Sequence, residues 1–160
     1  MVAVALTLTV TMNNAVFQKA QLNFAKGQVE TVGDALYTDL TQANYNNNAG
    51  HVFCYAYAQD FRFHGDIDND GYTDMVRYYG VYNGETGFWS LYRTLNSGAP
   101  LLMGTNFISI TFQYYDAKGK IVTDPSLIKA VRVSLVENVE GATEGFTQVV
   151  KDFKIYPSNL

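Results

Sequence analysis

The N-terminal quarter of the chain carries more apolar surface than its own domain can cover. Residues 1–12 contain no charged side chain. Further along, apolar residues recur at three- and four-residue steps, which is typical of one face of a helix. These residues are Leu22, Ala25, Val29, Val32, Leu36, Leu40 and Ala43. A single helix over residues 2–43 would be roughly 60 Å long, because each residue adds about 1.5 Å. We therefore expect its first half to pack against something outside its own domain.

The opposite face of this expected helix is polar, and an asparagine-rich tract at residues 44–50 ends it. Its polar residues are Gln28, Glu30, Thr31, Asp34, Thr38, Asp39 and Gln42. The apolar run stops at Asn13, short of the roughly 20 residues that a membrane crossing needs, so we interpret it as part of a longer apolar helix. Because Thr7, Thr9 and Thr11 alternate with apolar residues, a first strand over residues 2–11 is the alternative.

The chain after residue 50 has the pattern of short strands separated by turns. The expected strands cover residues 52–58, 60–64, 75–82, 88–95, 107–115, 128–136 and 146–156. In the fifth of these, Ile108, Ile110, Phe112 and Tyr114 alternate with polar residues, so one face is expected to be buried. Short connections favour antiparallel hairpins. The sequence therefore predicts an α+β fold, with a long N-terminal helix (residues 1–45) packed on an antiparallel β-sheet head (residues 46–160).

The amino-acid composition argues against several classes of function. The 11 Lys and Arg residues against 15 Asp and Glu residues give a net charge of -4, which argues against nucleic-acid binding. The single cysteine, Cys54, excludes an intramolecular disulfide and a zinc site built from cysteines. The two histidines, His51 and His64, are given no catalytic role. Because no nucleophile elbow, P-loop or metalloprotease motif is present, we do not expect an enzyme.

One acidic loop is the strongest local signal for a ligand. Oxygen-bearing side chains alternate through it, with a glycine at the sixth position, the pattern that lets carboxylates converge on a hard cation. The predicted calcium ligands are Asp66, Asp68, Asp70, the backbone carbonyl of Tyr72, and Asp74. Arg77 stands where a helical calcium loop would have its bidentate glutamate, so an EF-hand is excluded. The alternative is a polar hairpin turn without an ion.

Several segments, taken in their order along the chain, carry a family resemblance. After the helical residues 21–45 come FHGDIDNDGYTDMVRYY, LYR at residues 91–93, LLMGTNFISITFQYYDAKGK and IKAVRVSLV. This series resembles minor pilins and pseudopilins of type IV pili and type II secretion systems. The leader of that family is missing here, and Ala5 stands where the family usually has glutamate. We therefore expect either that the chain is trimmed upstream of residue 1 or that its processing differs.

The resemblance implies a pilin-like fold and a structural role. It implies a filament or tip-complex subunit that contacts other pilin or pseudopilin subunits through the N-terminal helix. It would be held in the inner membrane and periplasm before assembly, and would then belong to a filament at the cell surface or outside the cell. The alternative function is a calcium-stabilised extracellular binding module, with exposed tyrosines and Trp89 as a platform for a carbohydrate. A hydrolase using Asp66 or Asp68 is a more remote hypothesis.

Overall fold

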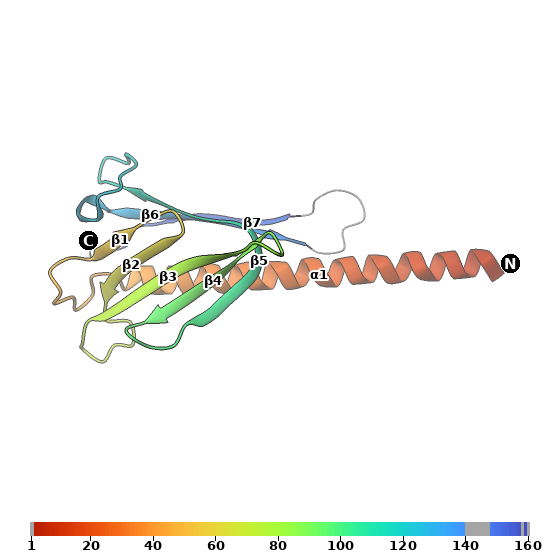
Figure 1. The fold of residues 1–160 in the computed structure, drawn as a ribbon, viewed down its shortest axis with the longest axis horizontal. Helices are drawn as coiled ribbons and strands as arrows, with labels where there is room; N and C mark the ends of the chain where they lie inside the picture. The colour runs from red at the N-terminus through yellow and green to blue at the C-terminus, as the bar shows by residue number, and fades with distance from the viewer. Residues whose placement is uncertain (1, 140–147, 158, 160) are drawn as a thin grey trace.

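The protein consists of one long N-terminal helix followed by a β-sheet head (Figure 1). This computed structural model describes residues 2–139, 148–157 and 159, and for residues 2–13 it describes the backbone alone. The elements are α1 (Val2–Thr41), β1 (Phe53–Ala56), β2 (Asp60–Gly65), β3 (Asp74–Asn83), β4 (Phe88–Leu95), β5 (Leu101–Tyr115), the short 3-10 helix η1 (Pro125–Leu127), β6 (Ala130–Asn138) and β7 (Gln148–Ile155). Because α1 begins at Val2, the alternative of a first strand over residues 2–11 is wrong.

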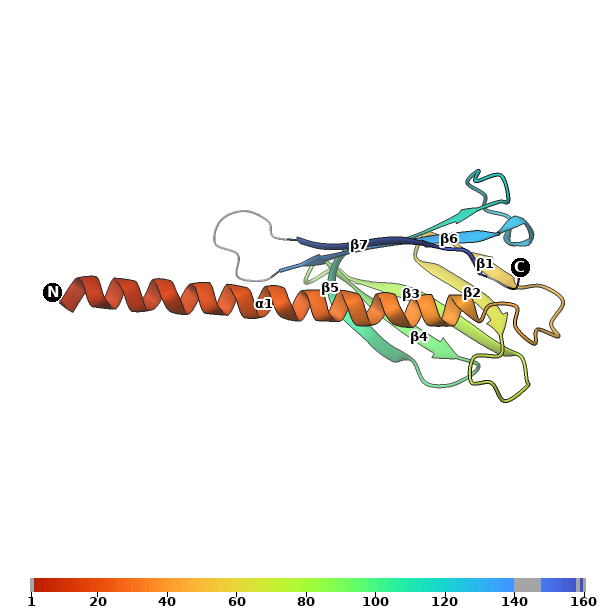
Figure 2. The same cartoon turned by 180° about the vertical axis from the view of Figure 1, so that it is seen from behind.

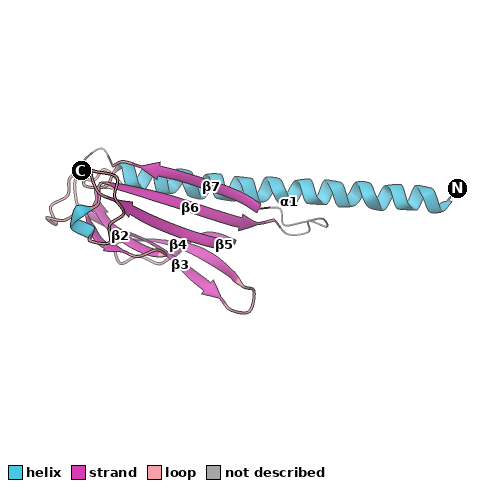
Figure 3. Ribbon diagram, turned by 90° about the horizontal axis from the view of Figure 1, so that it is seen from above, coloured by secondary structure: helices cyan, strands magenta, loops and turns pink. Residues whose placement is uncertain are grey.

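Within the described residues, the strands form a single seven-stranded sheet in which each strand pairs with the next one along the chain. All six pairings are antiparallel, from β1 with β2 to β6 with β7. Figure 3 shows the strands side by side, and Figures 1 and 2 show the sheet curling around the C-terminal half of α1. The predicted antiparallel meander is therefore confirmed.

The fold class predicted from the sequence, α+β of the pilin-like kind, is wrong. Strands dominate the head and form one continuous curled sheet, whereas the helix is a single element added to it. The expected packing of a helix on the sheet is present, but only the second half of α1 contributes to it (Figure 2). The sequence pattern predicted the order of the helix and the strands and contains no measure of how far the sheet curls.

The second half of α1 packs through the predicted apolar stripe. Buried positions on the stripe are Ala25, Val29, Val32, Leu36, Leu40 and Ala43, and Leu22 is half-buried. They join buried aromatic and aliphatic side chains from the sheet, among them Phe61, Tyr78 and Leu91. Fully burying a side chain of the Val or Leu size contributes roughly 1.5–3 kcal/mol, so this stripe fixes the second half of α1 to the sheet.

The first half of α1 projects beyond the head (Figures 1 and 2). At the start of the described side chains, Val16, Phe17 and Phe24 are 68%, 54% and 65% exposed. Among the described residues, the structure contains no helix with the length and apolarity that a membrane crossing requires.

Asp39 departs from the predicted polar face of the helix. It is buried, and its carboxylate accepts hydrogen bonds from Arg93 Nε at 2.6 Å, Arg93 Nη2 at 3.2 Å and the Tyr78 hydroxyl at 2.6 Å. Tyr78 lies in β3 and Arg93 in β4, so Asp39 joins the helix to two strands of the sheet.

Strand β5 begins earlier and is less regular than predicted. It starts at Leu101, and its pairing with β6 shifts register between Phe107 and Ser109. Beside this shift, Asn106 adopts a φ of 60°, and Phe107 is buried while Ile108 is only half-buried. The alternation from Ile110 onward is as predicted. The first two residues of the last predicted strand, 146 and 147, lie outside the described residues.

Candidate metal site in the acidic loop

The acidic loop is the connection between the antiparallel strands β2 and β3. Gly65 and Asp74 are direct partners in the antiparallel register, so the two ends of the loop, Asp66 and Asp74, lie close together. Asn69 and Gly71 have φ values of 60° and 87°, the left-handed conformation that asparagine and glycine tolerate best. These two positions turn the chain back within the loop.

The structure brings three of the predicted ligands together. Carboxylate oxygens of Asp66, Asp68 and Asp74 lie within 4.8 Å of one another. Asp70 is not part of this group, and its Oδ1 accepts a hydrogen bond from the backbone nitrogen of Tyr72 at 2.8 Å. The side chain of Tyr72 is 75% exposed, and its predicted contribution was the backbone carbonyl alone. Asp66, Asp68 and Asp74 are therefore the residues whose geometry fits a cation.

One carboxylate oxygen of Asp66 has no hydrogen-bond partner among the residues that the structure describes. Its side chain is 1% exposed, and Oδ2 accepts hydrogen bonds from Asn46 Nδ2 at 2.8 Å and from the Gly71 nitrogen at 3.0 Å. Oδ1 is buried as well, yet no group in the described part of the chain donates to it. Leaving a buried charged oxygen without a partner is costly, and such atoms are rare in folded proteins. A cation beside Asp68 and Asp74 would supply the missing partner.

Two asparagines from distant parts of the sequence position the carboxylates. Asn46 donates to Asp66, and Asn96 Nδ2 donates to Asp74 Oδ1 at 2.6 Å. Asp74 Oδ2 also accepts from the Ile67 nitrogen at 3.0 Å. The tract around Asn46 was expected only to end the helix, and no role at this site was expected for Asn96. Hydrogen bonds that orient ligating carboxylates in this way are typical of metal sites.

The negative charges of Asp66, Asp68 and Asp74 have no neutralising cation in the described part of the chain. Among the residues that the structure describes, no Lys, Arg or His forms an ion pair with Asp66, Asp68 or Asp74. Two unit charges about 4.8 Å apart repel by roughly 3–4 kcal/mol at an effective dielectric constant of about 20. This repulsion favours a bound cation, and oxygen ligands suit a hard one such as Ca²⁺.

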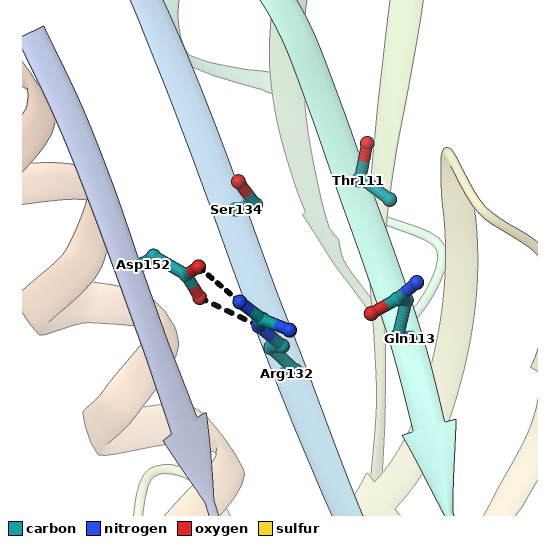
Figure 4. A pocket seen from close by; sticks show the side chains of 5 residues that line it. All are labelled: Thr111, Gln113, Arg132, Ser134 and Asp152. Carbon is teal, nitrogen blue, oxygen red and sulfur yellow. Dashed lines mark hydrogen bonds and ion pairs between the residues drawn. The ribbon is translucent and has the colours of Figure 1, made fainter. Parts of the chain in front are cut away.

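A separate polar depression of about 230 Å³ lies on strands β5, β6 and β7 (Figure 4). Arg132 binds Asp152 there through two hydrogen bonds, Nε to Oδ1 at 2.8 Å and Nη2 to Oδ2 at 2.5 Å. These bonds hold the pKa of the Asp152 carboxyl below its usual value, so it is a poor base. Ser134 and Thr111 line the same depression. They have no histidine beside them in this lining, so it does not resemble a hydrolytic site.

No protein-family model matches the chain, and no curated protein matches it at a significant level. The resemblance to minor pilins and pseudopilins therefore stays a prediction.

Proposed function

We propose that the protein is a non-enzymatic structural subunit of an extracellular or periplasmic filament or its tip complex, the role that minor pilins and pseudopilins have. The observation that carries the proposal is the projecting half of α1. Its backbone extends beyond the head, its residues 2–12 are uncharged in the sequence, and Phe17 and Phe24 are more than half exposed where it leaves the sheet. Apolar surface presented in this way is stabilised by contact with other subunits.

A size measurement tests this proposal. The full-length protein without detergent should self-associate, and a version that begins at Ala25 should be monomeric, because it keeps the buried stripe and loses the projecting half. Replacing Phe17 with Lys should weaken association. Replacing Tyr37, which is 57% exposed on the same helix beside the head, with Lys is the matched control and should leave association unchanged. A full-length protein that stays monomeric at high concentration would contradict the proposal.

We also propose that Asp66, Asp68 and Asp74 bind Ca²⁺ and thereby stabilise the head. The unpartnered Asp66 Oδ1 supports this proposal. At a Ca²⁺ concentration a hundred times the dissociation constant, binding would add about 2.7 kcal/mol to the free energy of unfolding. For a chain of this size that corresponds to a rise in melting temperature of about 5–11 °C, which a chelator should reverse.

Replacing Asp66 with Asn separates ion binding from folding. It removes one negative charge from the group, so without Ca²⁺ the variant should be at least as stable as the wild type. With Ca²⁺ it should show little or no rise in melting temperature. Replacing the exposed Asp34 with Asn is the matched control and should leave the response intact. A wild-type melting temperature that ignores both Ca²⁺ and chelator would exclude the site.

A calcium-stabilised extracellular binding module is the second candidate, because the same acidic group would serve it. Trp89 does not suit the platform suggested by the sequence, since it is half-buried and packs against the core. The exposed aromatic pair is Tyr55 and Tyr57, whose ring centroids are 6.1 Å apart. Carbohydrate binding that is lost when Tyr57 is replaced with Ala would favour this function over the first.

A further inference from the structure

The only two histidines of the chain and its only cysteine meet at one place in the fold. His51 precedes β1, Cys54 lies in β1, and His64 lies in β2. One ligand atom from each of the three side chains lies within 4.8 Å of the others. These are the residue types that bind borderline and soft metal ions, and the spacing of His51 and Cys54, with two residues between them, is common among zinc ligands.

The pairing of β1 with β2 explains how these side chains meet. Phe53 pairs with Phe63, both are buried, and their neighbours Cys54 and His64 are therefore on the partly exposed side of the sheet. The next pair is Tyr55 with Arg62, so Cys54 is an extra residue without a direct partner on β2. A register shift of this kind redirects a side chain, and here the Cys54 thiol lies against the His64 ring.

The separation between sulfur and nitrogen is the one that a tetrahedral ion needs, but the sulfur faces both ring nitrogens of His64. Cys54 Sγ lies 3.5 Å from Nδ1 and 3.7 Å from Nε2, so a turn of the Cys54 side chain must bring the sulfur in front of Nε2. In a tetrahedral zinc site with Zn–S of about 2.3 Å and Zn–N of about 2.05 Å, the sulfur and nitrogen ligands are about 3.6 Å apart. His51 is exposed and precedes the strand, so its side chain can rotate to complete the group.

The hydrogen bonding of His64 gives a second, independent indication. Its Nδ1 lies 3.1 Å from the backbone carbonyl oxygen of His51. A carbonyl oxygen only accepts hydrogen bonds, so this contact is a hydrogen bond when Nδ1 carries the proton, and that tautomer leaves the lone pair on Nε2. Metal-binding histidines usually donate their second ring nitrogen to a backbone carbonyl or a carboxylate, which fixes the tautomer in this way.

A nucleophilic cysteine is a poorer explanation of the same geometry. Reactive thiols have a lowered pKa, whereas burial raises the pKa of the Cys54 thiol, and the nearby Arg62 only partly opposes this effect. The His64 ring is held by a carbonyl and not by a carboxylate that would stabilise an imidazolium ion.

We propose that His51, Cys54 and His64 form a three-ligand site for a thiophilic divalent ion of the Zn²⁺ class, with a fourth position open to water or to a ligand from another molecule. On binding, the ion displaces the thiol proton to solvent and takes a place between Sγ and Nε2. The donor set excludes Ca²⁺, which prefers oxygen. This site is therefore chemically distinct from the acidic group that begins two residues after His64.

Co²⁺ is the probe for this site, because tetrahedral Co²⁺ bound to a thiolate gives a charge-transfer band in the near ultraviolet. The reduced full-length protein, freed of metal, should develop this band up to one equivalent of Co²⁺, and Zn²⁺ but not Ca²⁺ should abolish it. Zn²⁺ should also slow alkylation of Cys54, by about a hundredfold at a hundred times the dissociation constant, since only the metal-free fraction reacts.

Three variants and one control complete the test. Replacing Cys54 with Ser should abolish the band. Replacing His51 or His64 with Gln should weaken Co²⁺ binding at least tenfold, and the His51 variant is decisive because that residue lies outside the strands. The matched control, Asp66 replaced with Asn, should keep the band. Absence of the band in the wild type, or a band that both histidine variants leave unchanged, overturns the proposal.

Discussion

Replacing Asp39 with Ala should destabilise the head strongly, because Asp39 joins the helix to two strands. The replacement leaves the Arg93 guanidinium, whose side chain is 19% exposed, and the buried Tyr78 hydroxyl without their shared acceptor. Burial raises the pKa of Tyr78, and so does the neighbouring Asp39, so the hydroxyl stays protonated and donates. Removing one partner of a buried ion pair costs about 3–5 kcal/mol. For a chain of this size the expected loss in melting temperature is about 6–20 °C.

Urea and thermal unfolding followed by circular dichroism measure this loss. The matched control replaces Asp34, an exposed carboxylate on the same helix, with Ala and should change the free energy of unfolding by less than about 0.5 kcal/mol. A double variant, Asp39 to Leu with Arg93 to Met, should recover much of the loss, since it leaves no buried charge unpaired. If the Asp39 variant is as stable as the Asp34 control, the ion pair does not hold the helix to the sheet.

Two further predictions concern the same helix and the strands around it. A Cβ at Gly65 would lie 2.3 Å from the Gln42 carbonyl oxygen, so replacing Gly65 with Ala should lower the free energy of unfolding by about 1–3 kcal/mol. Gly27 has open space around it, so replacing it with Ala should stabilise the helix by about 0.5–1 kcal/mol. Unfolding in urea measures both, and equal effects would contradict the packing argument. Burial raises the pKa of Glu137 from 4.5 to about 7, against a weaker opposing hydrogen bond from Gln28, so the folded state binds the proton more tightly than the unfolded chain does. Stability should therefore fall as the pH rises from about 4.5 to about 7, by up to about 3 kcal/mol, and Glu137 to Gln should flatten this pH dependence of the free energy of unfolding.

The helix and the strands were predictable because their signals are local. A stripe from Ala25 to Ala43 follows the period of a helix, and turn residues such as Asn83 and Gly84 separate neighbouring strands. Asp39 was assigned to the polar face because of its charge, and its buried partner, Arg93, lies 54 positions away in the sequence. The helical period alone does place Asp39 beside the buried stripe, three residues after Leu36 and four before Ala43. The curl of the sheet cannot be read from any one segment, and the fold class was wrong for that reason.

In the acidic loop, too, the features within one segment were predictable and the contacts with distant residues were not. Alternation correctly brought Asp66, Asp68 and Asp74 together, since all three belong to one loop. Asp70, also predicted as a ligand, lies outside this group in the structure, where its Oδ1 accepts a hydrogen bond from the Tyr72 nitrogen. The supporting asparagines could not be recognised, because Asn46 and Asn96 lie 20 and 22 positions from the carboxylates that they bind.

The histidine and cysteine site was missed for a different reason. Counting cysteines correctly excluded a site made of cysteines, yet one thiol and two imidazoles are a sufficient set of ligands. The spacing of His51 and Cys54 was visible in the sequence, but the third ligand depends on the register shift at Cys54, which the structure alone reveals.

The arrangement of the molecule keeps the proposed assembly surface apart from both proposed metal sites. Figures 1 and 2 show the projecting half of α1 at one end of the protein and the loops before β1 and between β2 and β3 at the other. Subunits that pack through their helices would therefore leave these loops uncovered. Because the bound ions would lie at the end that faces away from the helical contacts, they can stabilise the head without competing with assembly. The open fourth position beside His51 would then face the surroundings of the assembled filament, where a ligand from another molecule could reach it.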